Sequence, residues 1–146
     1  MGSDAATAVP ELIQLYENPI SGPSQRYTLM AVGKIGPAAK MAIPSLLRTV
    51  ITSTEEEVRA SAVFALGGIH AEPERVVPVL IKCLADTSIE VQSEAAKGLG
   101  NFGENAKPAV PALVVLLQNQ NQDVMGHAKA ALLRIDPEAA TKAGVK

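Results

Sequence analysis

The sequence predicts an all-α fold, a right-handed α-solenoid of four helical hairpins with about eight helices. One observation is the composition, in which 47% of the 146 residues are hydrophobic but only 3% are aromatic and Trp is absent. A core built from Ala, Leu, Val and Ile suits closely spaced helices better than a β-sandwich. The other two observations are an apolar stripe that returns along the chain and a regular spacing of prolines.

The stripe is clearest in residues 58–69, where small or apolar residues fall at offsets of 0, 4, 7, 8 and 11. These offsets share one face of an α-helix. The members are Val58, Ala62, Ala65, Leu66 and Ile69. Two clear copies follow at Val91, Ala95, Gly98, Leu99 and Phe102, and at Val124, Ala128, Ala131, Leu132 and Ile135. A weaker copy precedes them at Ser24, Thr28, Ala31, Val32 and Ile35.

The prolines give the period of this repeat array. They are Pro10, Pro44, Pro78 and Pro111, at intervals of 34, 34 and 33 residues. Each follows a β-branched residue and precedes a Leu by two positions. A period of this length indicates a solenoid, in which each unit packs on its neighbours.

The first helix of each hairpin, the A helix, carries this proline near its start. In residues 43–51 the apolar residues recur at the spacing of an amphipathic helix. Proline is tolerated at an early helical position because the N–H there needs no intrahelical partner. If residues 38–42 are helical as well, Pro44 marks either a kink or a separate short turn, and both remain open.

The second helix of each hairpin, the B helix, is expected to begin at a capping box and to end at glycines. Thr54 with Glu57, and Thr87 with Glu90, have the capping-box spacing. Glycines in the last turn, which would let the next helix approach closely, are Gly33, Gly67 and Gly100. The expected left-handed exit positions are Gly36, His70, Gly103 and Asp136.

These signals divide the chain into units. The predicted helices span residues 5–17, 23–35, 38–52, 55–69, 73–85, 88–102, 105–118 and 121–134. They form a single repeat domain over residues 5–146, with repeats near 5–36, 37–70, 71–103 and 104–136 and a partial fifth helix at 137–143.

The ends and one connection are expected to differ from the rest. Residues 1–4 look like a cloning remnant and are expected to be disordered, and the connection 17–24 is expected to be the most mobile. Apolar residues persist in both the first helix and the last helix. Either the chain is therefore a fragment of a longer array, or another domain or copy makes end-to-end contact with it.

The repeat unit resembles the HEAT repeat, in the short HEAT-like form named after the phycobilisome lyases. The resemblance rests on Gly-Pro-Ala-Ala-Lys-Met-Ala-Ile-Pro-Ser-Leu-Leu at 36–47 and Glu-Val-Arg-Ala-Ser-Ala-Val-Phe-Ala-Leu-Gly-Gly-Ile at 57–69, and it covers residues 5–140. Tetratricopeptide units need Trp and Tyr at fixed places, which these copies lack, and the Thr-Pro-Leu-His turn of ankyrin units never appears. The family's usual arginine near the start of the B helix is present only as Arg59, with Gln25, Gln92 and Met125 at the equivalent positions.

No constellation of residues points to catalysis, a cofactor or a metal. HEAT-like di-iron hydroxylases use His-Glu pairs, whereas His70 and His127 are each followed by Ala. Cys83 lies close to the apolar stripe of an A helix and is interpreted as a half-buried structural thiol. The family name suggests bilin lyase activity, but nothing in the sequence marks a tetrapyrrole site.

Composition also limits the partners and the location. The net charge is −2, from 13 basic and 15 acidic residues, and no basic run favours nucleic acid. No apolar run approaches the roughly 20 residues of a membrane span, and no signal peptide is recognised. The compartment is undetermined, with the cytoplasm as the default.

In HEAT arrays the B helices line the concave surface, and the resemblance implies the same arrangement here. The positions expected to face away from the core are Arg26, Tyr27, Met30, Lys34, Ala60, Ser61, Phe64, Gly68, Ser93, Glu94, Lys97, Asn101, Gly126, His127, Ala130 and Arg134. Tyr27, Met30 and Phe64 form an exposed apolar cluster for a partner, or else Phe64 and Met30 lie in the seam between adjacent B helices.

We therefore expect a non-enzymatic protein-interaction or scaffold module that binds a protein or peptide segment on this face. The expected contact residues are Arg26, Tyr27, Met30, Lys34, Ser61, Phe64, Glu94, Lys97, Asn101, His127 and Arg134. Cations around the apolar cluster, at Arg26, Lys34 and Lys97, favour a segment with apolar anchors and acidic flanks. Two alternatives stay open, a lyase-like or regulatory subunit of an enzyme system and a structural spacer in a larger protein.

Overall fold

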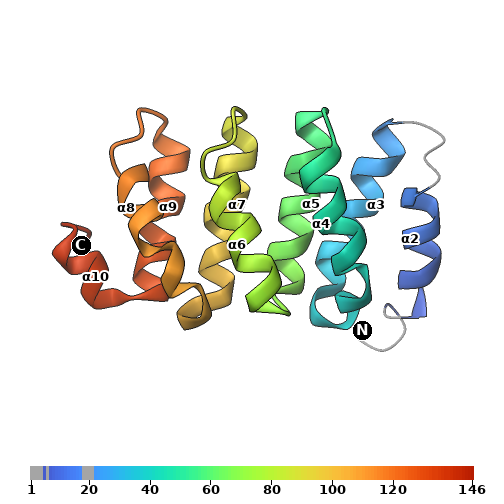
Figure 1. The fold of residues 1–146 in the computed structure, drawn as a ribbon, viewed down its shortest axis with the longest axis horizontal. Helices are drawn as coiled ribbons and strands as arrows, with labels where there is room; N and C mark the ends of the chain where they lie inside the picture. Colours follow the sequence, from blue (N-terminus) through green and yellow to red (C-terminus); the bar gives the residue numbers. More distant parts are fainter. Residues whose placement is uncertain (1–4, 6, 18–21) are drawn as a thin grey trace.

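The computed structural model describes residues 5, 7–17 and 22–146 (Figure 1), so the expectations for residues 1–4 and for most of the connection after residue 17 lie outside it. The elements are α2 (Val9–Glu17), α3 (Gly22–Ile35), η1 (Gly36–Ala42), α4 (Ile43–Thr52), α5 (Glu56–Ile69), α6 (Pro73–Cys83), α7 (Ile89–Phe102), η2 (Gly103–Ala109), α8 (Val110–Leu116), α9 (Gln122–Ile135) and α10 (Pro137–Lys142). All of these elements are helical, which confirms the predicted class.

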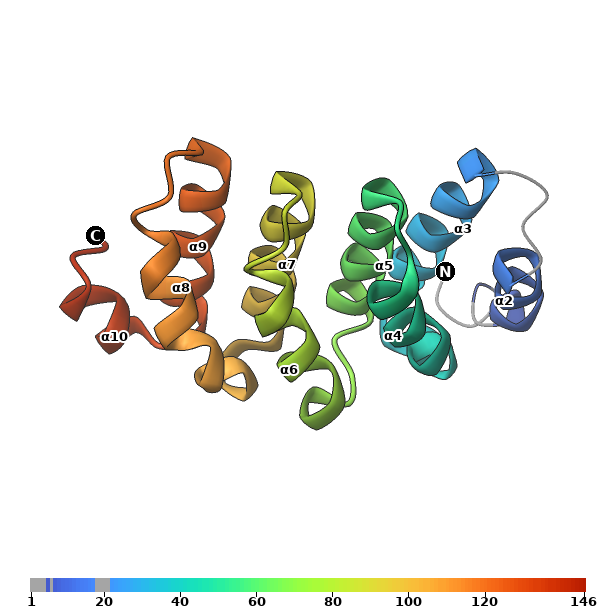
Figure 2. The ribbon, with the colours of Figure 1, turned by 45° about the horizontal axis from the view of Figure 1, so that its top comes forward.

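The helices pair into hairpins that stack side by side in two layers (Figures 1 and 2). The A helices α2, α4, α6 and α8 form one layer, and the B helices α3, α5, α7 and α9 form the other. Neighbouring B helices are in extensive contact, whereas α4 and α6 touch only slightly. An array bends toward its more tightly spaced layer, so the B helices line the concave side.

The repeated stripe forms the core, as predicted. Every member of the three clear copies is buried, from Val58 to Ile135. In the weaker first copy, among the four members whose burial is described, Val32 is buried and Thr28, Ala31 and Ile35 are half-buried. The first hairpin therefore contributes less to the continuous core than the other three.

Glycines set the spacing of the B helices. A methyl group at Gly67 would lie 2.6 Å from Gly98 Cα, and one at Gly33 would lie 2.8 Å from Ala65 Cα. At Gly100 the same addition would come within 3.3 Å of the α9 backbone. The helices therefore meet backbone to backbone, which confirms the predicted role of these glycines.

Two A helices differ from their predicted extent. The predicted helices 38–52 and 105–118 each divide into a 3₁₀ segment, η1 or η2, and a shorter α-helix. Pro44 and Pro111 lie in the first turn of α4 and α8, where a missing N–H costs no intrahelical bond. The separate short turn is thus the alternative that occurs. In the third hairpin Pro78 lies inside α6 instead.

The predicted capping boxes of α5 and α7 are wrong. Both helices begin two residues after Thr54 and Thr87, and neither has a side-chain cap. Instead, before α5 the Ser53 hydroxyl oxygen accepts the backbone N–H of Glu55 at 3.3 Å, and before α7 Oδ1 of Asp86 accepts the backbone N–H of Ser88 at 2.9 Å. These local turns fix the chain before the helix and leave the threonines outside it. Asn121 caps α9.

The predicted left-handed exits occur at three of the four positions. Gly36, His70 and Gly103 have φ of +74°, +34° and +53°. The prediction for Asp136 is wrong, because its φ is −153°. Its carboxylate accepts the N–H of Ala139 and caps α10, and an N-cap residue takes extended backbone.

A polar ladder joins the loops that precede the B helices. Arg59 Nη2 and Nε donate to the two carboxylate oxygens of Asp86 at 2.9 and 3.1 Å. Gln92, which replaces the arginine in the next unit, donates to the Asp86 carbonyl at 2.6 Å and accepts from Asn119 at 3.3 Å. The ladder continues past the missing arginine because an amide both donates and accepts.

In the last hairpin the apolar residues of the repeated stripe are buried. Val124, Leu132 and Ile135 are buried between α9 and its neighbours. After α10, the N–H of Val145 bonds the carbonyl of Ala140 at 2.9 Å, and both residues are buried.

Replacing Gly67 with alanine should destabilise the fold, because the methyl group would meet the α7 backbone and force two helices apart. The free energy of unfolding in urea should fall by about 1–3 kcal/mol. Gly126→Ala, also in a B helix, is the control, since nothing lies within 4 Å of an added methyl there. That variant should gain about 0.5–1 kcal/mol from helix propensity. Equal stability of the two variants would contradict the packing argument.

Asp86 links stability to pH. Burial opposes ionisation of its carboxyl group, but the hydrogen bonds from Arg59 and from the Ser88 N–H outweigh it and lower the pKa. A carboxyl group whose pKa is lower in the folded state stabilises that state above its unfolded pKa. This contribution is lost as the pH falls through the folded pKa.

Asp86→Asn should therefore reduce the free energy of unfolding at pH 7 by about 1–3 kcal/mol, the range for hydrogen bonds to charged groups. The difference from the original protein should shrink as the pH is lowered toward about 2. Urea denaturation across this pH range measures both effects. A difference that stays constant with pH would exclude ionised Asp86 as its source.

Candidate functional site

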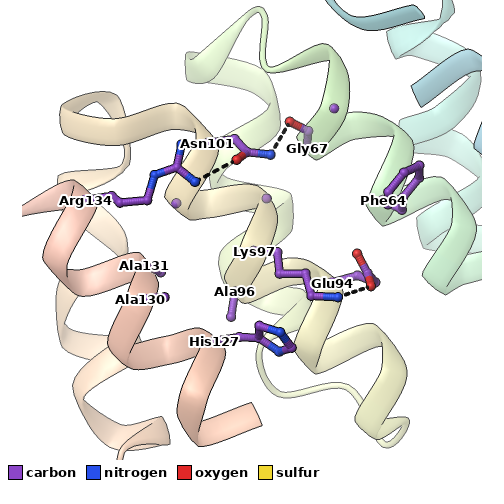
Figure 3. A pocket seen from close by; sticks show the side chains of 13 residues that line it. Phe64, Gly67, Glu94, Ala96, Lys97, Asn101, His127, Ala130, Ala131 and Arg134 are labelled. Carbon is purple, nitrogen blue, oxygen red and sulfur yellow. Dashed lines mark hydrogen bonds and ion pairs between the residues drawn. The ribbon is translucent and has the colours of Figure 1, made fainter. Parts of the chain in front are cut away.

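The concave layer contains a hollow of about 290 Å³ between α5, α7 and α9, which we call the larger hollow (Figure 3). It is lined by Phe64, Gly67, Gly68, Glu94, Ala96, Lys97, Gly98, Gly100, Asn101, His127, Ala130, Ala131 and Arg134. Many of these residues are glycine or alanine. The small residues that bring the B helices together therefore also leave the space above them open.

A smaller hollow of about 60 Å³ lies next to it, between α3, α5 and α7. It is lined by Arg26, Met30, Ala60, Ser61, Phe64, Glu90 and Glu94. Phe64 and Glu94 line both hollows. The two hollows thus meet on the concave face and can contact a single ligand.

Phe64 combines the two roles that the sequence left open. Its ring packs against α3, since a methyl group at Gly33 would meet Phe64 Cε1 at 2.9 Å. The side chain is nevertheless only half-buried and borders both hollows. Phe64 therefore fills part of the seam and also presents apolar surface.

A chain of hydrogen bonds crosses the larger hollow (Figure 3). Arg134 Nη1 donates to Asn101 Oδ1 at 3.0 Å, and Asn101 Nδ2 donates to the Gly67 carbonyl at 3.1 Å. These bonds connect α9, α7 and α5 and hold the Asn101 amide in place. An amide has two donor hydrogens and two acceptor lone pairs, so Asn101 keeps further capacity for a ligand.

The cations near Phe64 are largely paired with the chain's own carboxylates. Lys97 Nζ lies 2.7 Å from Glu94 Oε1, and Arg26 lies 3.2 Å from Glu57 and 3.8 Å from Glu90. Exposed pairs of this kind contribute little to stability and can exchange partners. Arg26 and Lys97 therefore lie near the apolar cluster, as expected, but each already has a carboxylate partner within the chain.

The structure brings most of the expected contact residues together. Those in the larger hollow are Phe64, Glu94, Lys97, Asn101, His127 and Arg134. Arg26 and Met30 line the smaller hollow, whereas Tyr27 and Lys34 are exposed but border neither.

Ser61 lines the smaller hollow, but little of its surface is open to a partner. Only 6% of it is exposed, and its hydroxyl donates to the Glu57 carbonyl at 2.8 Å. Ala60 and Ser93, also expected to face away from the core, are buried as well. The cause is the close approach of neighbouring B helices, which covers positions that a lone helix would expose.

Sequence reasoning missed the small residues that shape the larger hollow. Ala96 and Gly98 were not expected to border a site, because small residues carry no chemical signal of their own. The closely spaced glycines Gly98 and Gly100 were the available sign, since a missing side chain marks close backbone approach.

The described residues offer no grouped ligands for a metal. Within the described ranges no three His, Cys, Asp or Glu side chains cluster at ligand distance. His127 is half-buried, and its Nδ1 is buried without a hydrogen-bond partner in the described part of the chain. No helix in the described ranges combines the length and apolarity that a bilayer crossing requires.

Cys83 faces a third hollow, of about 220 Å³, on the side of the A helices. Only 6% of the surface of Cys83 is exposed to solvent. Burial in apolar surroundings raises the pKa of the thiol to about 11, with a smaller contribution from Asp86. The thiolate that nucleophilic chemistry requires is therefore scarce near neutral pH.

Solved structures with the same architecture are repeat solenoids and related proteins. A structure described as an engineered protein has 27% identity and a TM-score of 0.68, and the match covers 93% of this chain and 68% of that one. A designed armadillo repeat protein in complex with the peptide (KR)4 has 20% identity and a TM-score of 0.75, covering 95% and 71%. At that identity the likeness shows the fold alone.

A third similar structure is the complex of CpcE and CpcF of phycocyanin lyase from Nostoc sp. PCC7120. It has 26% identity and a TM-score of 0.67, and the match covers 88% of this chain and 78% of that one. No curated protein matches the sequence.

Two family models match the sequence itself. A model of HEAT repeats matches residues 77–143, and a model of the PBS lyase HEAT-like repeat matches residues 58–86. Together they span more than half of the chain, in the region where the helical hairpins are most regular. The chain therefore belongs to the HEAT repeat proteins and carries repeats of the PBS lyase HEAT-like type.

Proposed function

We propose that this chain is a non-enzymatic interaction module that binds a segment of a partner protein on the concave face. The observation that carries the proposal is the meeting of the two hollows at Phe64, on the layer that glycine contacts hold most tightly. A surface held in place loses little conformational entropy when a ligand binds.

The chemistry of the hollows suits a protein segment. Phe64 offers apolar surface, and half-buried aromatic side chains often anchor a partner. The Asn101 amide is held by Gly67 and Arg134, and its remaining donor and acceptor suit the peptide groups of a ligand backbone. An open hollow of about 290 Å³ can accept one or two side chains.

A second candidate is a subunit of an enzyme system whose chemistry lies elsewhere. Its support is the likeness to the complex of CpcE and CpcF of phycocyanin lyase, at 26% identity over 88% of this chain. Both candidates require contact with a protein, and they differ in whether the partner is an enzyme subunit. Activity reconstituted only when a partner subunit is added would favour this second candidate.

Blocking the larger hollow should abolish segment binding. A random peptide library displayed on phage is first selected against the intact chain, and the enriched peptides are synthesised. Ala130→Gln adds a long neutral side chain at an exposed position that lines the larger hollow. The dissociation constant measured by fluorescence polarisation should rise about tenfold or more, a loss of about 1.4 kcal/mol.

Val115→Gln is the matched control. Val115 is 71% exposed on α8, an A helix, and lines neither hollow. This variant should bind the selected peptides as the original chain does, and both variants should melt within a few degrees of it. Peptides that bind both variants equally would rule out the concave face as the site. Failure to enrich any peptide would favour a structural spacer.

A further inference from the structure

The two hollows carry opposite charge. The larger one is lined by Lys97 and Arg134 against one carboxylate, Glu94. The smaller one is lined by Arg26 against Glu90 and Glu94. Lys97 pairs with Glu94, which leaves Arg134 as the unbalanced charge of the larger hollow. Arg26 lies closer to Glu57 than to Glu90, which leaves Glu90 as the unbalanced charge of the smaller hollow.

The unbalanced charges lie at opposite ends of the B helices. Arg134 is in the last turn of α9, and its recorded partner is the neutral amide of Asn101. Glu90 is in the first turn of α7, and its contact with Arg26 is long, at 3.8 Å, because that guanidinium lies closer to Glu57. Arg134 can therefore attract an anionic group of a ligand at one end, and Glu90 can attract a cationic group at the other.

We infer that the partner segment is bipolar, with an acidic side chain at Arg134, a basic side chain at Glu90 and an apolar side chain between them on Phe64. This inference rests on the proposed function and names the chemistry of its ligand. A uniformly acidic segment would meet Glu90 and Glu94 in the smaller hollow. A uniformly basic segment would meet Arg134 and Lys97 in the larger one.

The helix geometry sets the spacing of the two charges. Glu90 and Asn101 are the first-turn and last-turn residues of α7 on this face, a rise of roughly 16 Å at 1.5 Å per residue. One further helix spacing of about 8–10 Å leads to α9. The diagonal is roughly 19 Å, which about six residues of extended chain span at 3.3 Å each.

Three synthetic peptides test the inference. The bipolar probe is acetyl-Glu-Glu-Ser-Leu-Phe-Leu-Ser-Lys-Lys-amide, and two matched probes carry Glu only or Lys only at the charged positions. Fluorescence polarisation at low salt should give about five-fold tighter binding for the bipolar probe, the effect of one added exposed ion pair. This advantage should shrink at high salt, because screening weakens exposed pairs.

Charge reversal should switch the preference. Arg134→Glu should lose the advantage of the bipolar probe and favour the Lys-only probe, whereas Glu90→Lys should favour the Glu-only probe. Lys129→Glu is the control, since Lys129 is exposed on the same helix as Arg134 but lines neither hollow. It should leave the order of the three probes unchanged, and melting temperatures should show that all variants fold.

The outcomes separate this inference from the proposed function. Equal binding of the three probes, weakened for all of them by Ala130→Gln, would overturn the bipolar partner and leave the interaction module intact. No binding of any probe would also overturn the bipolar partner, while peptides from the display selection could still bind the concave face. Bipolar binding that Ala130→Gln leaves unchanged would place the site elsewhere and overturn both.

Discussion

Backbone-to-backbone contact between the B helices is the constraint on which this structure depends. Gly33, Gly67 and Gly98 leave no side chain between neighbouring helices, so the B layer is spaced more tightly than the A layer. The A helices α4 and α6 touch only slightly, and the stack therefore curves toward the B side. The same missing side chains leave the larger hollow above the seam. Curvature and binding surface thus have one cause.

The B helices are held in register at both ends by different means. Toward their C-termini the glycines bring the backbones together, and Asn101 links Gly67 to Arg134 across the layer. At their N-termini the contacts of Arg59 and Gln92 join one loop to the next. A surface supported in this way presents its side chains at a fixed spacing, which suits recognition of an extended partner.

Much of the fold and part of the site follow from local sequence patterns. The stripe from Val58 to Ile69, the period of the prolines and the glycine exits each depend on neighbouring residues, so the hairpins and their core faces were predictable. The positions of the B helices that were expected to face away from the core likewise include Phe64, Asn101 and Arg134, which lie together on one surface. The capping boxes failed because Asp86 and its equivalents make a competing local turn before the helix.

The sequence by itself determined the class, the repeat and which face of each helix is apolar, because these properties depend on periodicity within one unit. Only the tertiary structure decided what the outward face offers, because that depends on how closely the units pack. Close packing buried Ser61, placed Phe64 half in the seam and paired Lys97 with Glu94. Each hollow is lined by charged residues from more than one helix, so the opposite charge of the two hollows cannot be recognised in the pattern of any single helix.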